Sequence, residues 1–79
     1  MATQSIELTA EWVSLTSGNQ SAFLQIETGM AYWCDSDAEP LTGAAVHRLL
    51  DEIKFTPPMK IWIRSGPSSK AKVIVTTWE

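Results

Sequence analysis

Cys34 and His47, the single cysteine and the single histidine, are a conceivable pair of nucleophile and base. A base such as imidazole activates a thiol by taking its proton, and the two residues can be distant in sequence. Such a pair also needs a group that orients the base and donors for an oxyanion, and no motif supplies either. We therefore predict that the protein is not an enzyme, and that Cys34 is a small buried hydrophobic residue.

Metal ligands are equally sparse. A zinc site needs three or four converging ligands, and the sequence has neither a CxxC nor an HxxxH spacing. Asp35, Asp37 and Glu39 alternate along one segment, but the ligand positions of a calcium loop are missing. We predict that this segment is a solvated acidic loop, and that the protein holds no metal and no cofactor.

Tryptophan is the residue type best suited to recognition in this chain, with four among 79 residues. In an extended chain, side-chain alternation places Trp62 on one face with Lys60 and Arg64, and the two isoleucines between them on the other. Trp62 is then either a core residue or an exposed ring flanked by two cations. Because exposed Trp and Arg are typical of protein interfaces, we predict Lys60, Trp62, Arg64 and Trp78 as interface residues.

Length and charge limit the remaining classes. Residues 1–79 are predicted to form one domain, whose small core and single cysteine favour extra stabilisation by oligomerisation or by a partner. The formal net charge of −3 argues against nucleic acid as a partner, since a phosphate backbone requires a basic surface. No apolar run reaches about 20 residues, and the start lacks a signal-peptide pattern, so we expect no membrane association and a cytoplasmic site of assembly.

The elements that would carry these residues are predicted to be strands. After a mobile start at residues 1–4, alternating runs at residues 5–16 and 21–28 are followed by a short apolar run at residues 31–34. The first of these is one bent strand or two short ones. Two β-branched runs, residues 60–64 and 71–78, flank turn-forming residues 65–69 and predict a hairpin. The fold class is therefore all-β, a small antiparallel sandwich or barrel-like meander ending in that hairpin.

One segment is ambiguous. Val46, Leu49, Leu50 and Ile53 follow helical spacing, so local pattern favours a short helix within residues 44–53. The alternative is a strand at residues 46–50, a turn at 51–52 and a second strand at 53–56.

The order of the strand-like runs resembles that of small all-β structural proteins of tailed phages and prophages. The matching runs are EWVSL at 11–15, FLQI at 23–26, the loop at 36–40, Gly43 leading into 46–49, DEIKF at 51–55, IWIRS at 61–65 and the closing run at 73–78. The resemblance favours strand–turn–strand for residues 44–55 and transfers no catalytic residues.

The resemblance implies a non-enzymatic structural protein that oligomerises and packs on a larger head or tail protein. Its location would be the virion, assembled in the cytoplasm of a bacterial host. The alternative is a small carbohydrate- or surface-binding β-module that uses exposed tryptophans, since planar aromatic rings stack on the apolar faces of sugars.

Overall fold

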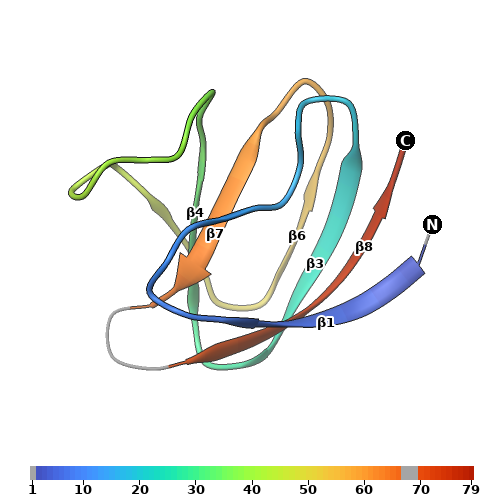
Figure 1. Cartoon of the computed structure of the whole chain (residues 1–79). Helices are drawn as coiled ribbons and strands as arrows, with labels where there is room; N and C mark the ends of the chain where they lie inside the picture. The colour runs from blue at the N-terminus through green and yellow to red at the C-terminus, as the bar shows by residue number, and fades with distance from the viewer. Residues whose placement is uncertain (1, 67–69) are drawn as a thin grey trace.

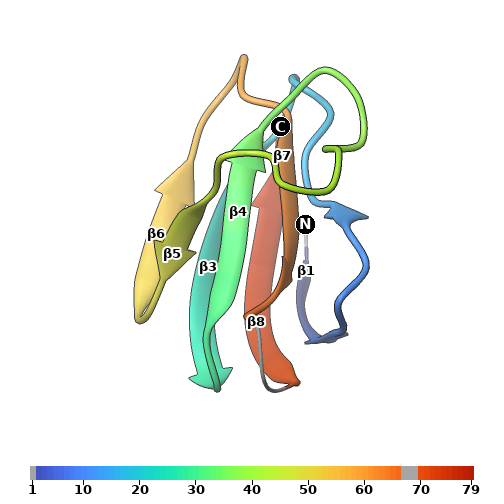
Figure 2. The same ribbon diagram turned by 90° about the vertical axis from the view of Figure 1, so that its left-hand side faces the viewer.

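Two four-stranded antiparallel sheets, packed face to face, make up the computed structural model, which describes residues 2–66 and 70–79 (Figures 1 and 2). Sheet A has the order β1 (Ala2–Leu8), β8 (Ala71–Trp78), β3 (Ser21–Thr28), β6 (Glu52–Phe55). Sheet B has the order β2 (Val13–Ser14), β7 (Ile61–Ser65), β4 (Ala31–Asp35), β5 (His47–Leu49). The predicted all-β sandwich is confirmed, and the described residues contain no helix.

The core lies between the two sheets, where alternate residues of each strand point inward. In β3, Ala22 and Leu24 are buried, as its alternation predicts, and their partners in β8 and β6 are inward-facing as well. The largest fully buried side chains come from both sheets: Leu8, Leu24, Phe55, Ile61, Ile63, Val73 and Val75. Trp33 packs at the margin of this core, with its ring edge-on to Phe55 at 4.8 Å between centroids.

The predicted C-terminal hairpin is wrong. The two strands exist, but β7 pairs with β2 and β4, whereas β8 pairs with β1 and β3 in the other sheet. Residues 67–69 of the predicted turn lie outside the described residues. Alternation shows that each of the two strands has one apolar face. The apolar face of β7 and that of β8 meet the same core from opposite sheets, so the pattern alone does not identify the strand with which each one pairs.

Residues 44–55 form two strands in different sheets, so the helix predicted over residues 44–53 is wrong and the strand–turn–strand alternative is confirmed. A helix would place Leu49 and Leu50 on one buried face. In the structure Leu49 is buried in β5, while the side chain of Leu50 is 68% exposed at the corner that leads into β6.

The N-terminal run forms two strands, β1 and β2, which lie in different sheets. β1 begins earlier than predicted, since residues 2–4 pair with residues 75–77 of β8 and are not a mobile start. Only β4 and β5 are consecutive strands paired with each other; every other described connection between consecutive strands passes from one sheet to the other.

Candidate functional site

Aromatic rings and one arginine gather on the outer face of sheet B. Tyr32 in β4 is the cross-strand partner of Arg64 in β7, so both side chains point away from the core. The guanidinium carbon of Arg64 lies 4.8 Å from the centroid of the Tyr32 ring and 5.1 Å from that of Trp12, which enters from the segment between β1 and β2. We call Trp12, Tyr32 and Arg64 the aromatic–arginine cluster. Contact with two rings restrains the guanidinium, whose Nη1 also donates to the main-chain oxygen of Ser65 at 3.4 Å, and leaves its other hydrogen-bond donors available.

Three of the four predicted interface residues share this face. Trp62 lies outside the core and is half-buried on the outer face of sheet B, as alternation with the buried Ile61 and Ile63 requires. Arg64 and Trp62 follow each other on that side of β7, and Lys60 directly precedes the strand. Trp78 is half-buried on the outer face of sheet A, where Lys54 Nζ lies 5.8 Å from its ring centroid. The predicted set is therefore divided between two opposite faces of the sandwich.

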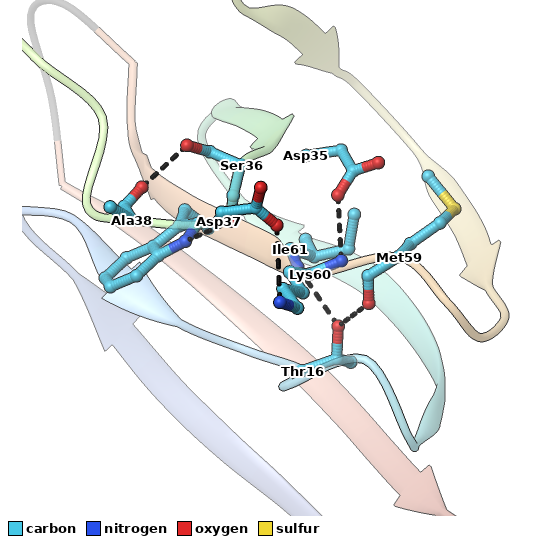
Figure 3. A network of polar contacts seen from close by, with 9 residues as sticks. Thr16, Asp35, Ser36, Asp37, Ala38, Met59, Lys60 and Ile61 are labelled. Carbon is cyan, nitrogen blue, oxygen red and sulfur yellow. Dashed lines mark hydrogen bonds and ion pairs between the residues drawn. The ribbon is translucent and has the colours of Figure 1, made fainter.

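A polar network fixes the loop that follows β4 against the start of β7 (Figure 3). The indole N–H of Trp62 donates to the main-chain oxygen of Ser36 at 3.0 Å, and the N–H of Ser36 donates to the oxygen of Lys60 at 2.9 Å. The N–H of Lys60 donates to Asp35 Oδ1 at 2.8 Å, while Lys60 Nζ lies 3.2 Å from Asp37 Oδ1. The acidic segment is thus partly structural: Asp35 accepts a main-chain bond, whereas the side chain of Asp37 is 94% exposed.

Thr16 holds the other side of this network. Its buried hydroxyl donates to the oxygen of Met59 at 2.8 Å and accepts from the N–H of Ile61 at 3.1 Å (Figure 3). The N–H of Leu15 also donates to the oxygen of Ile61 at 2.7 Å, which extends the pairing of β2 with β7. Sequence reasoning missed Thr16, because a threonine in a strand-like run carries no local signal of a distant main-chain partner.

The anchored loop borders two grooves on sheet B. The first, of about 610 Å³, lies between residues 39–44 and the segment that carries Glu11 and Trp12, with Arg64 in its wall. The second, of about 690 Å³, lies between the same loop and residues 34–36. Leu41 lines both grooves and is 81% exposed. Among residues 2–66 and 70–79, no carboxylate lies within ion-pairing distance of Arg64, although Glu11 and Glu39 also line the first groove.

Cys34 and His47 are not brought together. His47 is the cross-strand partner of Trp33 and stacks on its ring at 4.5 Å between centroids. Cys34, the next residue in β4, points to the opposite face, where it is buried beside the second groove. Burial raises the pKa of the Cys34 thiol, the negative charge of Asp35 raises it further, and Arg64 acts in the opposite direction. The thiol is therefore held in its protonated, weakly nucleophilic form.

Within the described residues, 2–66 and 70–79, no three His, Cys, Asp or Glu side chains converge as metal ligands would, and no helix has the length and apolar character needed to cross a bilayer. Comparison with protein-family models, with curated proteins and with solved structures finds no match to this chain.

Proposed function

We propose that this chain is a non-enzymatic structural protein that packs through the outer face of sheet B, on other copies and on a larger protein of an assembly. The proposed assembly is the head or tail of a tailed phage or prophage particle, because the strand order resembles that of small structural proteins of such particles. On this proposal the protein resides in the virion.

The observation that carries the proposal is the exposure of Leu41 beside the aromatic–arginine cluster. Leu41 is 81% exposed, so a partner that covers it would remove its apolar surface from water, which favours binding. Next to it, Trp12, Tyr32 and Arg64 are of the three residue types most enriched where binding energy concentrates in protein interfaces. The loop that bears Leu41 is anchored at its start by the Ser36 bonds, so docking would order less chain than a free loop would require.

The test is a comparison of two leucine-to-aspartate variants. Leu41→Asp charges the groove, whereas Leu50→Asp makes the same change at the exposed corner between β5 and β6, which lines neither groove. Static light scattering over a concentration series, from micromolar to millimolar, reports the mass of the wild-type protein and of both variants.

We expect the mass of the wild-type protein to rise above that of the monomer, the mass of Leu41→Asp to rise less, and Leu50→Asp to follow the wild type. If the masses of the two variants rise equally with concentration, the outer face of sheet B is not the contact between copies. The same pair of variants, added to purified head or tail particles of the phage that encodes the chain, tests the second half of the proposal.

A carbohydrate ligand is the second candidate, and the first groove is the feature that favours it. One wall of this groove is Trp12 and the other is the loop at residues 39–44, in which Glu39 and Thr42 are polar, a combination suited to stacking and hydrogen bonding with a sugar. Titration of oligosaccharides into the Trp12→Phe and Trp78→Phe variants separates the two indoles by fluorescence. A shift lost only with Trp12→Phe supports glycan binding in this groove, and a flat response across a broad panel counts against it.

A further inference from the structure

β1 is the longest unpaired strand edge of the sandwich. It lies at the end of sheet A, and within the described part of the chain no strand pairs with its outer side. The other three edge strands are shorter: β6 has four residues, β5 has three and β2 has two. An edge of seven residues leaves a row of main-chain donors and acceptors that a further strand can satisfy.

This edge lacks the features that usually prevent strand addition. β1 contains no proline and no lysine, and Glu7 is its single charged residue. β6, in contrast, carries Lys54 and Glu52 and is soon followed by Pro57 and Pro58. Lysine and proline at an edge oppose pairing with another chain, so β6 is protected where β1 is open.

An apolar seam runs along the same side of the molecule. β1 and the short blue strand β2 end the two sheets on one side of the sandwich (Figure 2). Ile6 and Leu15 are half-buried at this margin of the core, and Val13 is 36% exposed. Whatever pairs with β1 would also cover these three side chains.

We propose that a second copy of this chain occupies this edge, with the two β1 strands paired antiparallel about a two-fold axis at Ser5. This register sets Ser5 opposite Ser5 of the other copy, Thr3 opposite Glu7 and Gln4 opposite Ile6. No like charges then face each other, and the inward faces of both copies stay on one side of the joined sheet. Sheet A becomes a continuous eight-stranded sheet, and the two apolar seams meet. The inference rests on the proposed function, and it names the partner and geometry of one of its contacts.

The test places charges at Ser5 in the Leu41→Asp background, in which the contact proposed for sheet B is removed. Ser5→Lys and Ser5→Glu each set two like charges opposite one another at the two-fold axis, whereas an equimolar mixture sets opposite charges there. Gln25→Lys is the matched control. Ser5 and Gln25 are the two cross-strand partners of Ile74 and both are exposed, but Gln25 lies on the inner strand β3.

We expect the Leu41→Asp protein to dimerise by light scattering, and each Ser5 variant to raise the dissociation constant at least about tenfold. The mixture and the Gln25→Lys control should return to within about threefold of the parent. A monomeric parent, or Ser5 variants that dimerise as the parent does, would overturn the inference. Neither result bears on the sheet B contact, which is tested separately by comparing the masses of Leu41→Asp and Leu50→Asp in the otherwise unchanged protein.

Discussion

Replacing Thr16 by valine should destabilise the fold strongly although it changes the side-chain shape very little. Valine keeps the branched shape of threonine but removes the hydroxyl that bonds Met59 and Ile61. The Ile61 N–H would then be buried without a partner, at about 1–3 kcal/mol, and the bond to the Met59 oxygen adds about 0.5–1.5 kcal/mol. We expect a total loss of about 1.5–4.5 kcal/mol, against a stability of roughly 4–12 kcal/mol for a chain of this length.

Chemical denaturation with urea measures this loss directly. Thermal unfolding is a second measure: at about 4–8 °C per kcal/mol for a domain of this size, the midpoint should fall by about 6–36 °C. Thr16→Ser is the control, because it retains the hydroxyl and loses one methyl group, at about 1 kcal/mol. If Thr16→Val is as stable as Thr16→Ser, water reaches the Ile61 N–H and the proposed role of the network is refuted.

Three further changes test other parts of the structure. Gly29→Ala should lower the free energy of unfolding, measured in urea, by about 2–4 kcal/mol, because φ is +78° and a Cβ would lie 2.9 Å from the Lys70 oxygen. Gly43→Ala is the control: its φ is +86° but no atom lies near the added Cβ, so it should lose only the conformational part, about 1–2 kcal/mol. The raised pKa of Cys34 implies a stability contribution that is complete below the ordinary thiol pKa and declines as pH rises through it toward the folded-state value. Cys34→Ala should therefore flatten the alkaline fall in unfolding free energy, and an unchanged slope would contradict this. Trp62→Phe should cost about 1 kcal/mol by loss of its bond to Ser36, with faster amide exchange in residues 36–45, and unaltered exchange would show that the loop is held by other contacts.

Side-chain alternation predicts which face of each strand is buried, but not which strand it pairs with. The inward set of β3 and the outward position of Trp62 follow directly from period two, because neighbouring side chains in a strand point to opposite sides. The false hairpin and the false helix share one cause. Residues 60–78 and 44–55 each contain two strands of different sheets, and a local pattern carries no information about which sheet a strand joins.

The candidate site was predicted only in part for the same reason. Arg64, Trp62 and Lys60 are close in sequence, so alternation groups them. Tyr32, Trp12, Leu41 and Thr16 reach the site from other segments, through cross-strand pairing and loop anchoring that no local spacing records. Trp78 was grouped with Trp62 by residue type alone, and the structure separates them because their strands belong to different sheets.

The passage of the chain from sheet to sheet has a consequence for how the protein is made. β8 lies between β1 and β3, so β1 has no partner in sheet A, and β3 has only β6, until the ribosome has released β8. The nascent chain must keep its apolar strands from pairing wrongly through most of its synthesis, and its folding, limited by the closure of long loops, should be slow for its length. A product that stops short of Ala71 would lack the strand that joins β1 to the rest of sheet A, and quality-control proteases should remove it.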